Sequence, residues 1–212
     1  IENEMAKNKE DDTCTIIFTS GTTGVPKGVM LTHKNYMAQM KVIHNFVNCK
    51  PGECWMTILP VWHSFERLIQ YVVLLMKCYV AYSKPVAPIL LPDMEQIKPQ
   101  WICGVPRLWE ALATGVERAM KKKGGITYKM FSFFISTGKA YAKMKDLICE
   151  NVCQIKKRSR LLDKIVGLVP FILLWPLHKL GDLLVYKKIR AKFGGNITIA
   201  ISGGGALQPN ID

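Results

Sequence analysis

Short apolar runs rich in β-branched residues alternate along the chain with longer segments in which apolar positions recur every three or four residues. Between them, the proline-rich segment 84–99 predicts an irregular connection. Because strands that alternate with helices form βαβ units, we expect an α/β fold with a mainly parallel sheet covered by helices. The pattern predicts strands at 14–19, 28–31, 54–59, 78–82, 101–105 and 197–201, and helices near 33–47, 64–77, 107–122, 128–150 and several between 155 and 192.

The first predicted strand leads into a loop of glycines, hydroxyl residues and one lysine. The run 14–18 is apolar and β-branched, which predicts a buried strand. Glycines allow backbone N–H groups to approach an anion closely, hydroxyls add donors, and lysine adds a compact positive charge. The loop is therefore suited to the phosphates of ATP. Its candidate binding residues are Thr19, Ser20, Gly21, Thr22, Thr23, Gly24, Lys27 and Gly28.

The order of residues in this loop separates it from other phosphate loops. The common form G-x-x-x-x-G-K-[ST] places a hydroxyl residue directly after the lysine, whereas Lys27 follows Pro26 and precedes Gly28. Composition alone would equally fit a surface turn. The order T-S-G-T-T-G-x-P-K-G, however, resembles the phosphate-binding signature of the adenylate-forming (AMP-binding) superfamily, which contains acyl-CoA synthetases, luciferases and the adenylation domains of peptide synthetases.

Three further segments resemble the same superfamily in order and spacing. Residues 59–67, Leu-Pro-Val-Trp-His-Ser-Phe-Glu-Arg, are similar to its L-P-x-x-H-x-x-E/R segment. Residues 104–110, Gly-Val-Pro-Arg-Leu-Trp-Glu, look like the V-P-R-x-[WF]-E box of its long-chain acyl-CoA synthetase branch. The region 182–207 resembles the same branch and ends in Ser-Gly-Gly-Gly-Ala-Leu, where the branch carries S-G-G-A-x-L. The resemblance therefore spans nearly the whole chain, as part of the large N-terminal domain of such an enzyme.

The resemblance implies a reaction and a set of roles. A fatty carboxylate would attack the α-phosphorus of ATP, releasing pyrophosphate, and the thiol of coenzyme A would then displace AMP from the acyl-adenylate. The loop 19–28 would hold the β- and γ-phosphates, with Lys27 and His63 as the candidate catalytic residues and Thr23 near Mg²⁺. The remaining nucleotide-site residues that the resemblance implies are Ser202, Gly203, Gly204 and Gly205.

The residues around position 63 also have structural interpretations. A histidine that follows a turn can simply cap a helix, and Glu66 with Arg67 can form a structural ion pair. The aromatic residues Trp62, Phe65 and Tyr71 could line an acyl passage, although aromatic residues at helical spacing more often belong to a core.

At 212 residues the chain is long enough for one good core, but shorter than a complete member of the superfamily. The resemblance implies three downstream features that these residues lack: an aromatic-Gly-x-Thr-Glu loop, a ribose-binding aspartate and a C-terminal lysine. We therefore expect the chain to be an internal fragment that is inactive alone. Other interpretations are an acyl-carrier-protein synthetase or other adenylating ligase, and, in a different class, a nonenzymatic membrane-surface binding module.

The net charge of +13 lies in one part of the chain. Residues 115–200 contain 18 Lys/Arg and 5 Asp/Glu, while the remainder contains 11 of each. This predicts a basic helical insertion at 115–195 that contacts an anionic membrane surface, since basic residues beside the apolar run 165–177 favour such a surface. A solvated helix face is the alternative. A transmembrane helix is not expected, because the run has only about 13 apolar residues and contains Pro170 and Pro176.

The seven cysteines are an odd number without paired spacing, which fits small buried apolar side chains in a reducing compartment. We therefore expect a cytoplasmic protein, peripherally associated with membrane if the insertion binds lipid. No zinc-finger spacing or aromatic-rich RNA-binding signature is present in the sequence, so nucleic acid is not an expected partner.

Overall fold

The computed structural model describes residues 7–21, 24–43, 45–151 and 159–208. The chain divides into two compact units, which are considered separately. The first unit comprises residues 1–90, 99–105 and 197–205, and the second comprises 91–98, 106–196 and 206–212.

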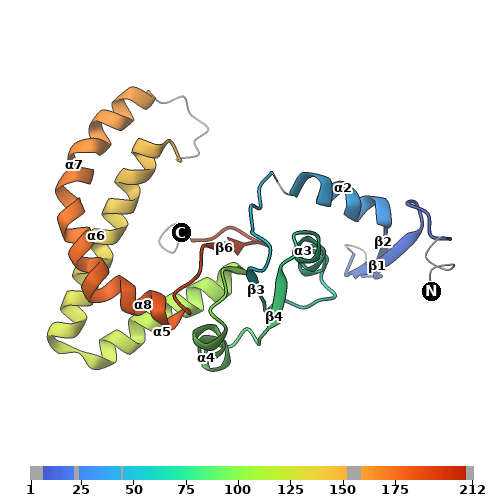
Figure 1. The fold of residues 1–212 in the computed structure, drawn as a ribbon. Helices are drawn as coiled ribbons and strands as arrows, with labels where there is room; N and C mark the ends of the chain where they lie inside the picture. Colours follow the sequence, from blue (N-terminus) through green and yellow to red (C-terminus); the bar gives the residue numbers. More distant parts are fainter. Residues whose placement is uncertain (1–6, 22–23, 44, 152–158, 209–212) are drawn as a thin grey trace. The chain divides into compact units, whose positions relative to one another are not determined.

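The first unit contains a four-stranded parallel sheet with the strand order β4-β3-β5-β6. Figure 1 labels β3, β4 and β6 of this sheet. Helix α3 (Ser64–Leu75) connects β3 (Cys54–Thr57) to its parallel neighbour β4 (Tyr79–Tyr82) and so completes a βαβ unit. The other two strands are β5 (Trp101–Gly104) and β6 (Ile199–Ser202). Every residue of β3 and β5 is buried, as expected for central parallel strands. The predicted parallel sheet is therefore confirmed.

The core of this unit is built around two tryptophans on adjacent strands. The rings of Trp55 and Trp101 stack with their centroids 4.7 Å apart and their planes 8° from parallel. Trp101 Nε1 donates a hydrogen bond of 2.6 Å to the carboxylate of Glu53. From α3, Val72 and Val73 pack into the same cluster and are fully buried. The amphipathic face of α3 is thereby fixed against the sheet.

The strand before the loop is not buried as predicted. β1 (Thr13–Thr19) pairs only with β2 (Lys27–Thr32), in an antiparallel hairpin that α2 (His33–Ile43) follows. Ile16 is 53% exposed and Phe18 is 73% exposed. The apolar, β-branched run 14–18 predicts a strand correctly, but burial also needs a second layer, and no second layer covers Ile16 and Phe18 in the described part of the unit.

The proline-rich segment 84–99 is largely helical, so its prediction as an irregular connection is wrong. Helix α4 (Ala87–Ile97) has Pro88 in its first turn, where the missing N–H would have no partner in any case. Pro92 lies inside the helix and removes only one helical hydrogen bond. Leu90 and Met94, four residues apart, are both fully buried. Burial of this face outweighs the low helix propensity of proline.

The second unit is mainly helical. It contains α5 (Pro106–Lys123), α6 (Gly125–Cys149), α7 (Arg160–Gly181), a π-helical turn η1 (Asp182–Tyr186) and α8 (Lys187–Lys192). The last three are the helices predicted between 155 and 192, and they follow one another without a break; residues 152–158 lie outside the described ranges. Pro170 and Pro176 lie within α7 without ending it.

This continuous helix also changes the expectation about membrane spans. The stretch Arg160–Lys192 has 33 residues and includes an 18-residue window that is long and apolar enough to cross a membrane by length and composition alone. Only 6% of that window is buried inside the structure. The expectation against a spanning helix rested on an apolar run of about 13 residues that contains Pro170 and Pro176, and the helix continues through both prolines.

Helices α6 and α7 pack along each other as an antiparallel pair (Figure 1). Glycines permit the close approach: a Cβ atom added to Gly181 would lie 2.8 Å from the Phe134 ring and 2.8 Å from the Tyr186 ring. Tyr141 stacks on His178 with a centroid distance of 4.0 Å, and the Tyr186 hydroxyl donates to the carbonyl of Phe134. The pair therefore has a defined register.

Replacing Gly181 by alanine should destabilise this helical pair. The added methyl group must displace two packed rings, and overpacking of this kind costs about 1–3 kcal/mol, partly offset by the better helix propensity of alanine. Thermal and urea unfolding will measure the loss. Gly115→Ala on the exposed surface of α5 is the matched control, because its Cβ would meet no atom within 4 Å. The control should gain about 0.5–1 kcal/mol, and equal stabilities of the two variants would contradict the packing.

Candidate functional site

The predicted phosphate loop closes the β1–β2 hairpin. Thr19 and Lys27 are register partners at its end, and the Thr19 hydroxyl donates to the Lys27 carbonyl at 3.4 Å. Gly21 has φ +52°, and a Cβ there would lie 2.6 Å from the carbonyl oxygen of Val25. Gly24 has φ +79°. The turn therefore depends on glycine at two positions, as a loop that presents its backbone to an anion requires.

The described part of this loop is open to solvent. Thr19, Ser20, Gly24 and Lys27 are exposed, and Gly28 is also exposed. Thr22 and Thr23 lie outside the described residues, so the magnesium role of Thr23 remains a prediction. In the described ranges, no group of three or more His, Cys, Asp or Glu side chains could hold a metal ion.

His63 caps the N-terminus of α3. Its backbone is extended, and its Nδ1 accepts a hydrogen bond of 3.3 Å from the backbone N–H of Phe65. An accepting Nδ1 leaves Nε2 as the protonated nitrogen of the neutral ring. The capping interpretation is thus confirmed. It is compatible with a role beside an anionic substrate, because the first N–H groups of a helix carry a partial positive charge.

The glycine-rich end of β6 lies beside this helix terminus. Gly203 donates its backbone N–H to the Gly104 carbonyl at 3.0 Å, and a Cβ at Gly203 would lie 3.1 Å from the Phe65 ring. Gly204 follows with φ +80°. The structure therefore brings the carboxyl ends of β5 and β6 to the start of α3. Ligands of open parallel sheets bind at the carboxyl ends of strands.

The phosphate loop is not linked to this sheet edge in the same way. Among the residues described in the structure, no hydrogen bond or ion pair joins residues 19–28 to His63 or to the end of β6. Of the predicted site, Gly203 lies beside Phe65, two residues after His63. The convergence of His63, Ser202, Gly203, Gly204 and Gly205 with Lys27 stays a prediction.

Glu66 is a functional candidate that the sequence did not reveal. Its side chain is 1% exposed, and neither carboxyl oxygen has a hydrogen bond of normal geometry, although the side chains of Thr57 and Gln70 lie close enough to lower its pKa in part. Burial raises the pKa of this carboxyl group above its ordinary value. The predicted ion pair with Arg67 is wrong: Arg67 Nε instead donates to the Tyr71 hydroxyl at 3.0 Å. Successive residues on a helix point about 100° apart, which separates the two side chains.

We expect Glu66→Gln to stabilise the protein at neutral pH. A carboxyl group whose folded pKa is raised contributes its stability below the unfolded pKa of about 4.3 and loses it as the pH rises through the folded pKa. Glutamine does not titrate, so the variant should gain on the order of 1 kcal/mol at pH 7.5 and little at pH 4. Urea unfolding at both values measures this. Glu10→Gln, at an exposed position, is the control, and a pH-independent difference for Glu66→Gln would contradict the raised pKa.

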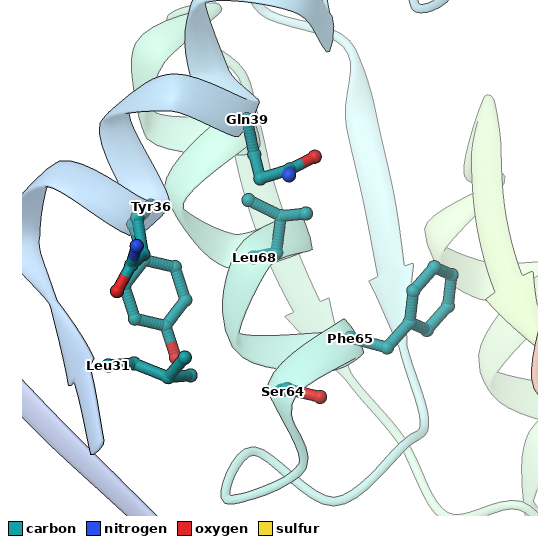
Figure 2. A pocket seen from close by; sticks show the side chains of 7 residues that line it. Leu31, Tyr36, Gln39, Ser64, Phe65 and Leu68 are labelled. Atoms are coloured by element: carbon teal, nitrogen blue, oxygen red, sulfur yellow. The ribbon is translucent and has the colours of Figure 1, made fainter. Parts of the chain in front are cut away.

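A pocket of about 320 Å³ lies between α2 and α3 (Figure 2). Its lining is mainly apolar and consists of Leu31, Asn35, Tyr36, Gln39, Ser64, Phe65 and Leu68. Of the aromatic residues considered for an acyl passage, only Phe65 lines this pocket. Trp62 is 76% exposed, and Tyr71 packs edge-on against Tyr36 at 5.3 Å. The sequence did not indicate Leu31, on β2, or Tyr36, on α2, because a contact with a helix distant in sequence has no local signature.

A parallel α/β sheet with a glycine-rich strand end, a helix N-terminus beside it and a phosphate-type loop defines a nucleotide-binding class of protein. The sequence profile of the family described as AMP-binding enzyme matches residues 2–212. The chain belongs to this family.

Individual relatives show which members the chain resembles. It is 35% identical over 208 residues to a chloroplastic long-chain-fatty-acid–[acyl-carrier-protein] ligase of Arabidopsis thaliana, covering 95% of this chain and 28% of that protein. It is 27% identical over 214 residues to long chain acyl-CoA synthetase 3 of the same plant, covering 99% and 28%. O-Succinylbenzoate coenzyme A synthetase of Bacillus subtilis, solved with ATP and magnesium, matches at 23% identity and a TM-score of 0.45, covering 50% of this chain and 22% of that chain. The chain thus spans just over a quarter of the length of these curated relatives.

Proposed function

We propose that this chain forms part of the ATP site of a ligase that activates long-chain fatty acids. In the first step, a carboxylate oxygen of the acid attacks the α-phosphorus of ATP, an acyl-adenylate forms, and pyrophosphate leaves. In the second, a thiol attacks the acyl carbon and AMP leaves. The observation that carries the proposal is the hairpin loop 19–28, whose signature and glycine-dependent turn suit a triphosphate.

The described residues support a division of labour in the first step. Backbone N–H groups of the loop and the Lys27 ammonium would hold the β- and γ-phosphates and stabilise the charge on departing pyrophosphate. The residues 202–205, with their glycine backbone, would lie against the nucleotide. His63, at the positive end of α3, would place the carboxylate rather than transfer a proton. When bound, Mg²⁺ would neutralise phosphate charge.

The acyl chain would occupy apolar space in the first unit. The pocket between α2 and α3 is the best-supported candidate, because its lining is mainly apolar and includes Ser64 and Phe65, the two residues that follow His63. Its volume is at the lower end of the range for small-molecule sites of about 300–1,000 Å³. A long chain would therefore need additional space.

Two thiol acceptors fit the family, and coenzyme A is our first proposal. An acyl-carrier-protein thiol is the alternative, and it is supported by the higher identity to the relative named as an acyl-carrier-protein ligase. The experiment is to place residues 1–212 in the corresponding position of a complete relative and to measure AMP formation from acids between acetate and oleate. Faster turnover with acyl carrier protein than with coenzyme A would select the alternative, and no AMP with any acid would contradict the proposal.

Location and partners are also part of the proposal. The six cysteines that the structure describes are free thiols, which supports a reducing compartment such as the cytoplasm. The excess of 13 positive charges in residues 115–200 supports contact of the predicted 115–195 insertion with an anionic membrane. A protein that bound such vesicles without contacting ATP would instead be the nonenzymatic membrane-surface module.

A further inference from the structure

We propose that α7 is the part of this chain that docks on a membrane, with its axis in the plane of an anionic bilayer surface and its outer face among the acyl chains. This inference deepens the membrane contact proposed above by naming the face, its orientation and the lipid chemistry. It does not depend on the ligase reaction.

The helix has one packed side and one bare side. Gly167, Phe171, His178 and Gly181 recur at helical spacing and face α6, where Phe171 and His178 both stack on Tyr141. The opposite side is apolar and open to solvent. Six of its residues are each between 58 and 70% exposed: Leu161, Ile165, Val166, Val169, Ile172 and Leu173.

The length of this face suits insertion into a membrane surface. No Asp, Glu, Lys or Arg occurs between Lys164 and Lys179, a distance of about 22 Å along a helix axis. A continuous apolar face of this size in a folded protein marks a surface that lipid, a partner or another part of the protein covers.

The charges favour lipid over protein as the cover. Lys179, Lys187 and Lys188 are exposed at or beyond the C-terminal end of the face, and none of them forms an ion pair with another described residue. Lys179 Nζ lies 5.9 Å from the centroid of the Trp175 ring, which is half exposed. A basic rim beside apolar and aromatic side chains matches anionic headgroups above acyl chains. If two copies of the chain packed together through this apolar face, their basic rims would repel each other.

The partner helix determines the orientation. By length and composition the stretch 160–192 could span a bilayer. However, α6 packs along α7 and exposes Lys129, Lys143 and Lys145, which a spanning α7 would carry into the hydrocarbon region. With α7 in the plane of the surface, these lysines stay in water or at headgroups. The in-plane arrangement satisfies both helices.

The test is cosedimentation of the purified protein with phosphatidylcholine vesicles and with vesicles of phosphatidylcholine and phosphatidylserine at 7:3. We expect at least tenfold tighter binding to the anionic vesicles and release by alkaline carbonate. Equal binding to both vesicles would overturn the role of charge, and retention through carbonate would overturn the in-plane orientation.

Two variants locate the contact on α7. Val169→Glu with Leu173→Glu should abolish vesicle binding, whereas Ile126→Glu on α6, at a position 84% exposed, should leave it unchanged. A triple change of Lys179, Lys187 and Lys188 to Gln, which alters only exposed side chains, should weaken anionic binding by roughly 100-fold, at about fivefold per basic residue. Circular dichroism checks that each variant is folded. Unchanged binding by folded Val169→Glu/Leu173→Glu, or a concentration-dependent dimer in place of vesicle binding, would overturn the proposal. ATP chemistry plays no part in this readout, so its failure and that of the proposed ligase are separable.

Discussion

Trp101→Ala should lower the free energy of unfolding by about 3–5 kcal/mol, as truncation of a buried aromatic residue generally does. Trp101 is 2% exposed, stacks on Trp55 and donates to Glu53. The truncation therefore removes a ring contact and opens a cavity between β3 and β5. It also removes the tryptophan N–H that Glu53 accepts from, although this carboxylate still accepts from the Lys50 backbone N–H at 3.0 Å. Equilibrium urea unfolding followed by circular dichroism measures the loss.

Trp62→Ala is the matched control for this experiment. Trp62 belongs to the same unit but is 76% exposed, so its truncation should change stability by no more than about 0.5 kcal/mol. If Trp101→Ala were as mild as the control, the stacked pair would not be the centre of the sheet core.

The second large effect is expected at the phosphate loop. Lys27→Ala, in a complete relative that carries this segment, should lower kcat/KM for ATP by roughly 10- to 150-fold, the equivalent of about 1.5–3 kcal/mol for a lost charge-assisted hydrogen bond. Lys27 begins β2, where its backbone pairs with Thr19. The side chain can therefore be removed without changing the turn. Steady-state AMP formation at varied ATP concentration gives the value.

Two further variants distinguish nucleotide contact from a general effect of charge. Lys41→Ala removes an exposed lysine from α2 in the same unit and should leave ATP use unchanged. Lys27→Arg keeps the charge and should recover part of the activity. If Lys27→Ala behaved like Lys41→Ala, the lysine would not contact the nucleotide.

Much of the fold could be predicted because it depends on local patterns. The strands β3, β5 and β6 follow from short apolar runs, and the parallel sheet follows from their alternation with helices. The exposure of β1 could not be predicted, because it depends on whether another layer of the structure covers the strand. Helix α4 was missed because its prolines predict irregular structure, while its stability comes from the burial of Leu90 and Met94.

The candidate site likewise combines residues that the sequence order reveals with contacts that only the structure shows. The loop residues and His63 could be found because their order in the sequence carries the signal. The contact between Phe65 and Gly203 joins residues far apart in the sequence and needed the structure. The burial of Glu66 also needed the structure. In the sequence, Glu66 stands beside Arg67, which suggests an ion pair at the surface and not a buried carboxyl group. The bare face of α7 became visible only when the helix proved continuous through Pro170 and Pro176.

The most direct measurement is a crystal structure of a complete relative carrying this segment, with ATP and Mg²⁺ bound. We predict the β- and γ-phosphate oxygens within hydrogen-bonding distance of the backbone N–H groups of residues 19–28 and of Lys27 Nζ, with Gly203 and Gly204 against the nucleotide. A triphosphate bound elsewhere, with this loop facing solvent, would contradict the account.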